Sequence, residues 1–136
     1  RGVRVLGGVT YSQGTQTKTS FGRYDGNTAV GAPRWQVNTG LEWDTPWIAG
    51  LTLSARVQAT SSQYADAANK LKIPGWGQLD LGARYAMLVN GKVVVLRLNV
   101  NNVFDKHYYA GSFSDTTPIA TLGPARTVTA SASISF

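Results

Sequence analysis

The last ten residues of the chain alternate strictly between hydroxyl and apolar side chains. From Arg126 to Phe136 the sequence reads RTVTASASISF. Even positions from Val128 onward are apolar, and odd positions carry threonine or serine. A repeat of two residues places these sets on opposite faces of a β-strand. The pattern therefore predicts a final strand with one apolar and one polar face.

The same alternation recurs in five earlier segments, and helical spacing fits none of them as well. Each is close to the roughly 9–11 residues that a tilted strand needs to cross a bilayer. With the last segment they predict about six antiparallel strands. The five segments are residues 3–13, 35–43, 51–60, 78–87 and 93–104.

The connections between these strands alternate in length. The short ones are residues 44–50 and 89–92, and the long ones are residues 15–33, 61–75 and 105–124. The long ones are rich in Gly, Ser, Thr, Asp and Pro. Short periplasmic turns on one side and long extracellular loops on the other are typical of outer-membrane β-barrels. In that orientation Phe136 lies at the periplasmic rim.

Composition favours a membrane-embedded sheet over a soluble one. Only 15% of the residues are charged although 43% are hydrophobic, and soluble surfaces are usually about a quarter charged or more. The mean hydropathy is −0.13, and no apolar run approaches the length of a membrane helix. After Arg126 the last strand has no charged residue and no proline. Soluble edge strands usually carry one or the other, which prevents pairing with other chains. Because the smallest outer-membrane barrels have about 8 strands, we expect partner strands outside this sequence.

The chemistry-bearing residues predict no enzyme. The net charge of +6 is scattered, so a nucleic-acid partner is not expected. The chain has no cysteine, and its single histidine, His107, lies in a loop, whereas a metal site needs several ligands. No base is placed to activate a serine or threonine. Since the chain starts at Arg1 with neither Met nor a signal peptide, we interpret it as part of a mature protein.

Two motifs near the C-terminus resemble those of TonB-dependent ferric-siderophore receptors. Residues 98–109 read LNVNNVFDKHYY, similar to the Asn-(Leu/Val)-Phe-Asp-Lys-x-Tyr-Tyr end of that family's penultimate strand. Residues 123–126 read GPAR before a strand that closes on Phe136, similar to the family's Gly-x-Pro-Arg opening with one alanine inserted. The segments GAPR at 31–34 and IPGW at 73–76 precede other strands in the same way.

The resemblance covers residues 1–136 and implies an all-β fold. The chain would be the C-terminal part of an antiparallel transmembrane β-barrel of about 22 strands with a plug in its lumen. The implied protein is a receptor in the outer membrane of a Gram-negative bacterium. It would import a ferric siderophore by TonB-dependent transport, with no covalently bound cofactor. Implied partners are the siderophore, the TonB complex, the receptor's own plug domain, and outer-membrane lipid or lipopolysaccharide.

The resemblance also points to candidate site residues. The last long loop holds Tyr108, Tyr109 and Phe113, and loop aromatics of this family pack on the siderophore. We favour Phe113, then Tyr109, as ligand-binding residues. Packing between loops, or in an aromatic belt, fits Tyr108 and Tyr109 equally well. Phe136 is implied to be a signal for the outer-membrane assembly machinery.

Other side chains are expected to be structural. Asn102 and Asp105 are expected to hold the backbone where a ladder ends. Three arginines should face the lumen and pair with Glu42, Asp80 or plug carboxylates; they are Arg56, Arg84 and Arg97. Three apolar residues should face inward near the periplasmic end, against a plug; they are Leu6, Val93 and Val95. Aromatic belts are expected at Trp43, Trp47 and Phe136 on the periplasmic side and at Tyr11, Trp35 and Trp76 on the outer side.

Two alternatives remain open from the sequence. Another large outer-membrane barrel, such as an autotransporter or adhesin, would have a passenger domain instead of a plug. A soluble β-sheet binding module would dissolve without detergent. For the receptor we expect either a curved sheet whose edges are paired by other copies, or part of a barrel whose remaining strands lie outside this chain, and not a closed six-stranded barrel.

Overall fold

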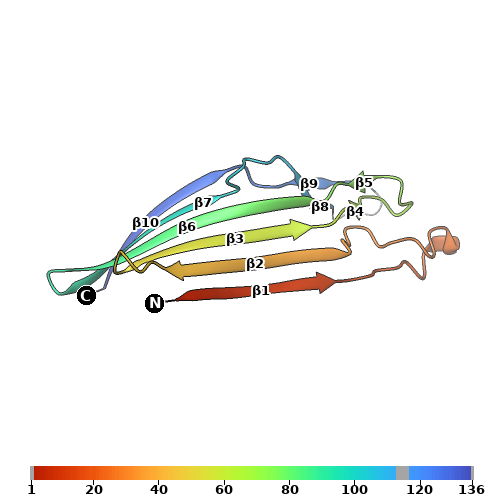
Figure 1. The fold of residues 1–136 in the computed structure, drawn as a ribbon. Helices are drawn as coiled ribbons and strands as arrows, with labels where there is room; N and C mark the ends of the chain where they lie inside the picture. The colour runs from red at the N-terminus through yellow and green to blue at the C-terminus, as the bar shows by residue number, and fades with distance from the viewer. Residues whose placement is uncertain (1, 113–116, 136) are drawn as a thin grey trace.

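The computed structural model describes residues 2–112 and 117–135. Within these residues, six long strands form one open, curved antiparallel sheet (Figure 1). Its order is β1-β2-β3-β6-β7-β10, so β1 and β10 are the two edges. This confirms the predicted all-β architecture. The strands are β1 (Val3–Tyr11), β2 (Trp35–Asp44), β3 (Leu51–Thr60), β6 (Trp76–Val89), β7 (Lys92–Asn101) and β10 (Thr127–Ser135).

All six predicted strands are present, with corrected ends. The strand expected over 93–104 stops at Asn101, because Asn102 adopts a left-handed backbone with φ of 52°, which lies outside the extended region that a regular strand occupies. The first strand ends at Tyr11 and not at residue 13. The strand expected over 78–87 is longer and begins at Trp76.

The long connections lie together at one end of the sheet, and the short turns lie at the other (Figure 1). The sequence did not predict the short elements inside the long connections. These are η1 (Ser20–Gly22), β4 (Gln63–Tyr64), β5 (Lys72–Ile73), β8 (Tyr109–Ser112) and β9 (Ala120–Leu122). Among the described residues, no helix has the length and apolar character to cross a membrane.

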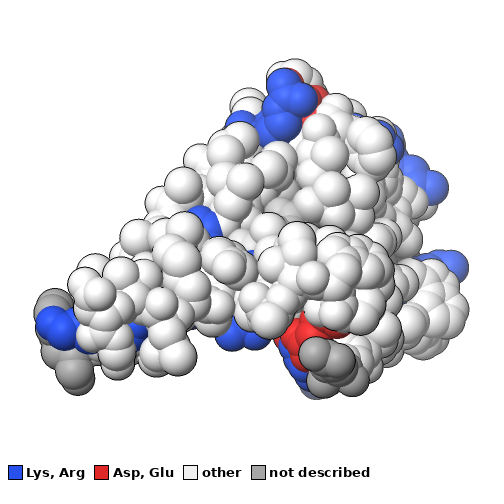
Figure 2. Space-filling view, turned by 60° about the vertical axis from the view of Figure 1, so that its left-hand side comes forward, with Lys and Arg blue, Asp and Glu red and all other residues white. Residues whose placement is uncertain are grey.

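The sheet has no hydrophobic core. The buried apolar side chains of the described residues are Ala65 and Ile73, and both belong to the loop between β3 and β6. The chain exposes 9198 Å², against about 6,900 Å² for a compact monomer of this mass. Most of the surface visible in Figure 2 carries no charged side chain. Apolar strand side chains such as Val5, Val9 and Leu98 are exposed, and a sheet with one such face needs lipid on that side, which argues against a soluble module.

The aromatic side chains gather at both ends of the sheet. Trp43 and Trp47 meet edge to face with ring centroids 4.9 Å apart at the turn end. Tyr11 and Trp35 pair at 4.7 Å at the loop end. Both pairs lie where belts were expected. Trp76 does not belong to a belt: it lies on the same side of β6 as Gln78 and Asp80, and its ring stacks on Tyr108.

Candidate functional site

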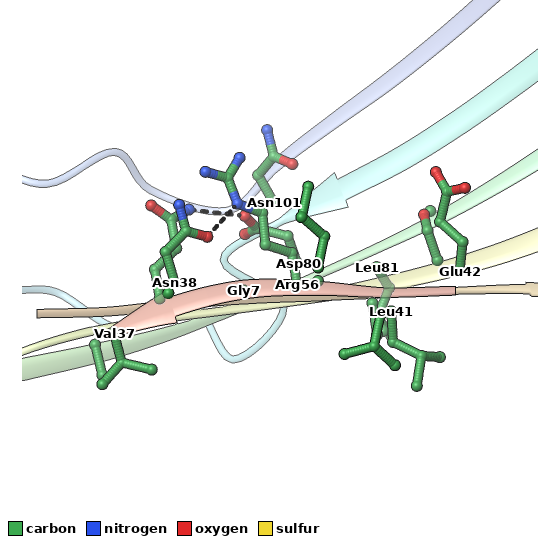
Figure 3. A pocket seen from close by; sticks show the side chains of 18 of the residues that line it. Gly7, Val37, Asn38, Leu41, Glu42, Arg56, Asp80, Leu81 and Asn101 are labelled. Atoms are coloured by element: carbon green, nitrogen blue, oxygen red, sulfur yellow. Dashed lines mark hydrogen bonds between the residues drawn. The ribbon is translucent and has the colours of Figure 1, made fainter. Parts of the chain in front are cut away.

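The pairing register sorts the strand side chains into two faces. The polar face carries residues such as Asn38, Glu42, Arg56, Asp80 and Asn101, and the apolar face carries Val37, Leu41 and Leu81. Figure 3 shows the two sets on opposite sides of the ribbon. On the polar side the curved sheet forms an open concave groove with a volume of about 1120 Å³. The polar face is therefore the surface on which a solute or another protein segment can lie.

An ion-paired cluster occupies the turn end of the polar face. The Arg4 guanidinium donates two hydrogen bonds to the Asp44 carboxylate, at 2.6 and 2.9 Å, and one to Glu42 at 3.1 Å. The Thr52 hydroxyl donates to Asp44 at 2.8 Å. The cluster links β1, β2 and β3. Because these ion pairs are partly exposed, each adds little stability, but together they are consistent with the register of the three strands.

The carboxylate of Asp80 organises the loop end of the polar face. It accepts hydrogen bonds from the side-chain amides of Gln78 at 2.7 Å and Gln58 at 3.2 Å. It also accepts the backbone N–H of Asn102 at 2.9 Å. These donors come from β6, β3 and the segment after β7. Asp80 therefore ties the last long loop to two strands of the wall.

Tyr108 connects the last loop to this network. Its hydroxyl donates to the Gln78 side chain at 2.6 Å, and its ring stacks on Trp76 with centroids 4.3 Å apart. Burial raises the pKa of the phenol, and the nearby Asp80 carboxylate adds to that effect. Tyr108 is thus packed between the last loop and strand β6, which differs from both packing between loops and a place in an aromatic belt.

The other two candidate ligand-binding aromatics are Tyr109 and Phe113. Tyr109 starts β8, pairs with Leu122 of β9 and is 49% exposed. It is therefore accessible for a ligand at the loop end. Phe113 lies outside the described residues, as does Phe136.

The Asn-x-Phe-Asp motif closes the base of the last loop. The side chain of Asn102 is fully buried; it donates to the carbonyls of Lys106 and Pro124 at 2.9 and 3.0 Å and accepts the Lys106 N–H at 2.9 Å. The Asp105 carboxylate accepts the Arg126 N–H at 2.9 Å, which holds the pKa of Asp105 below its usual value. Both residues have the structural roles that the sequence predicted.

The expectation that three arginines of the polar face pair with Glu42 or Asp80 is wrong. These arginines are Arg56, Arg84 and Arg97. Arg4 forms ion pairs with Glu42 and Asp44. Arg56 donates to the Asn38 amide oxygen at 2.9 Å, Arg84 to the Thr52 hydroxyl at 3.2 Å, and Arg97 to the Ser133 hydroxyl at 3.4 Å. Glu42 accepts a hydrogen bond from Arg4, and Asp80 accepts hydrogen bonds from three N–H groups. Neither carboxylate forms an ion pair with these three arginines.

The side chains of two other long loops interlock. The Asn69 side chain exchanges hydrogen bonds with the backbone of Thr28, at 2.7 and 2.9 Å. The amides of Gln16 and Asn27 both donate to the Ala67 carbonyl, at 3.1 and 2.9 Å. These hydrogen bonds therefore join two long loops, residues 15–33 and 61–75, into one folded unit at the loop end of the sheet.

Gly123 provides a test of the Tyr108 position. A Cβ atom at Gly123 would overlap the Tyr108 ring, which is rigid. We expect Gly123→Ala to displace Tyr108 and weaken its stack on Trp76, seen as a loss of near-ultraviolet circular dichroism from the aromatic pair. Gly8→Ala is the matched control, because nothing lies within 4 Å of a Cβ there. Equal spectra for both variants would contradict the arrangement.

The alternation along β6 could have placed Trp76 correctly, but it could not have revealed the ion pairs of Arg4. Trp76 has the same parity along β6 as Gln78 and Asp80, so the alternation already assigned it to the polar face. Its place at the strand opening suggested an interfacial belt instead. Arg4 was missed as an ion-pair partner because its carboxylates lie on the next strand, and only the register Arg4↔Glu42 brings them together.

Comparisons with known proteins agree with this geometry. The family model "TonB dependent receptor-like, beta-barrel" matches residues 2–103. The ferrichrome receptor FcuA of Yersinia enterocolitica is 36% identical over 135 residues, which cover 99% of this chain and 18% of that protein. The ferrioxamine receptor of the same organism is 32% identical over 116 residues, covering 81% of this chain and 16% of that protein.

A solved structure agrees in fold as well as in sequence. The crystal structure of BauA, the ferric preacinetobactin receptor from Acinetobacter baumannii, has a TM-score of 0.88 and 42% identity. The match covers 97% of this chain and 19% of BauA, so the chain spans less than a fifth of these relatives. The family consists of transport receptors and not of enzymes. The chain belongs to the TonB-dependent receptor-like β-barrel family and forms part of the wall of an outer-membrane barrel.

Proposed function

We propose that this chain is part of a receptor that imports a ferric siderophore across the outer membrane by TonB-dependent transport. The observation that carries the proposal is the 36% identity to a ferrichrome receptor over 99% of the chain. Relatives named for ferrioxamine and ferric preacinetobactin support the same substrate class. Residues 1–136 would then be the C-terminal part of the barrel, with its polar face toward the lumen.

The proposed transport needs partners outside this sequence. A plug domain would fill the lumen, as in transporter barrels of about 22 strands, and the TonB complex would supply the energy. The apolar face would meet lipid, and the outer loops would lie near lipopolysaccharide. Phe136 would serve as the assembly signal and as an interfacial anchor. The ferric siderophore is the transported ligand, bound through the loops and the plug.

The proposal is tested with the full-length receptor in a strain that lacks its own siderophore receptors. We expect uptake of radioactive iron from at least one of ferrichrome, ferrioxamine B and preacinetobactin. Uptake should disappear when TonB is deleted. If none of the three complexes is bound or imported, while the receptor is present and folded in the outer membrane, the receptor does not share the substrates of its named relatives, and the proposal loses the observation that carries it.

Tyr109 and Phe113 are the proposed ligand-contacting residues of this chain. Replacing either by alanine should weaken siderophore binding by about tenfold, because a buried aromatic contact contributes about 1–2 kcal/mol. Binding is measured by quenching of tryptophan fluorescence in the purified receptor. Tyr11→Ala is the control, since Tyr11 packs on Trp35 at the outer edge strand. Unchanged affinity in both loop variants would exclude this loop as a contact.

A further inference from the structure

Two arginines lie directly opposite each other on the polar face. Arg84 of β6 and Arg97 of β7 are cross-strand partners in the antiparallel register. Like charges in this position destabilise a strand pair. The two guanidinium groups turn away from each other, since Arg84 donates toward β3 at Thr52 and Arg97 toward β10 at Ser133. The two cations therefore bond to hydroxyls on opposite sides of the β6–β7 pair.

The described part of the wall offers no carboxylate to neutralise this pair. Asp44 is the acidic group nearest to Arg84 along the hydrogen-bond chain, but it is reached only through the Thr52 hydroxyl and is already bound twice by Arg4. Glu42 also bonds Arg4, and Asp80 bonds three N–H donors. Two positive charges therefore remain without an ionic partner among the described residues.

Both arginines are exposed on this open sheet, but apolar side chains lie beside them. Toward the turn end, the next cross-strand pairs on the same face are Ala86↔Val95 and Leu88↔Val93. Leu88 is 74% exposed. Apolar side chains exposed to a water-filled channel are unfavourable, whereas a protein segment packed over them removes their surface from water. Once a segment covers them, the adjacent arginines lose water, and an unpaired buried charge is costly.

We infer that Arg84 and Arg97 form a clamp for an acidic side chain of the plug domain, which packs over Ala86, Leu88, Val93 and Val95. This inference rests on the proposed function, because it needs a plug in the lumen. Charge complementarity identifies the contacting group as an aspartate or glutamate. The remaining four-fifths of the relatives' length leaves ample chain for such a domain. The clamp fixes the plug at the turn end of the wall, away from the loop that carries Tyr109.

The test converts the clamp into a covalent reporter in the full-length receptor. Arg84→Lys and Arg97→Lys keep the charge and supply an amine, which a water-soluble carbodiimide joins only to a carboxylate in direct contact. We expect each variant to give an amide cross-link between β6 or β7 and one acidic peptide upstream of Arg1, identified by mass spectrometry. Gln36→Lys, at the loop end of the same face, is the matched control and should not couple to that peptide.

Several results would overturn the inference. Cross-links from Arg84→Lys and Arg97→Lys only to Glu42, Asp44 or Asp80 would show that the wall neutralises its own charges. No cross-link in a variant with normal heat-modifiable migration would show that no carboxylate lies in the clamp. Coupling of Gln36→Lys to the same peptide would show a non-specific contact. Siderophore uptake by the unmodified receptor is measured separately, so a failed clamp is distinguishable from a wrong substrate class.

Discussion

Replacing Leu96 by arginine should destabilise the assembled receptor by about 2–4 kcal/mol, the cost of placing a cation on the lipid face near the bilayer midplane. Leu96 lies near the centre of β7 and is 40% exposed on the apolar face. Its cross-strand neighbours are Tyr85 and Ala132, and neither offers a carboxylate. Urea unfolding of the full-length receptor in phospholipid vesicles, followed by tryptophan fluorescence, measures the change.

The control for this substitution lies three residues away on the same strand. Asn99→Arg adds the same cation to the polar face, beside the groove. We expect it to change the free energy of unfolding by less than about 1 kcal/mol, because water or polar groups solvate the charge there. Equal destabilisation by both substitutions would mean that the two faces have been assigned wrongly, or that both are equally buried.

Asn102→Ala should be the most damaging substitution in the loop region. The side chain is fully buried and makes three hydrogen bonds, two with the backbone of Lys106 and one with the Pro124 carbonyl. Alanine leaves these partners unsatisfied, at about 1–3 kcal/mol for a buried group, and it must adopt the left-handed φ of 52°, which costs about 1–2 kcal/mol. We expect a loss of about 3 kcal/mol or more in the same unfolding experiment.

Two further variants separate the causes. Asn102→Gly removes the hydrogen bonds but tolerates the left-handed backbone, so it should lose less stability than the alanine variant. Asn101→Ala changes the neighbouring exposed asparagine, whose side chain makes no hydrogen bond within the described residues, and should be nearly neutral. If Asn101→Ala is as harmful as Asn102→Ala, the buried side chain is not what closes the loop.

The strands could be predicted from the sequence because alternation is a local property. Each strand is set by its own apolar and polar positions, so six windows sufficed to predict six strands. The exact end of β7 depends instead on Asn102, whose left-handed backbone is held by contacts with Lys106 and Pro124. Sequence alone cannot bring residues 102 and 124 together, so the predicted strand ran three residues too far.

The loop elements and the site depended on distant contacts. The short strands β4, β5, β8 and β9 have no alternation long enough to detect, and they are supported by contacts such as that between the Gln63 amide and the Ala110 carbonyl. Which carboxylate each arginine meets depends on the register between strands, which the pattern within one strand leaves open. Motif resemblance identified the family, but it could not reveal that Trp76 stacks on Tyr108.

The interlocked loops have a consequence for immune recognition of this surface. The Thr28–Asn69 exchange and the two bonds to Ala67 join segments that lie about forty residues apart in the chain. Any epitope across this junction is discontinuous. A peptide copied from residues 15–33 alone lacks the partners that shape it, so antibodies raised against it would recognise the denatured chain better than the native receptor. An immunogen that keeps this surface must present both loops on the same sheet.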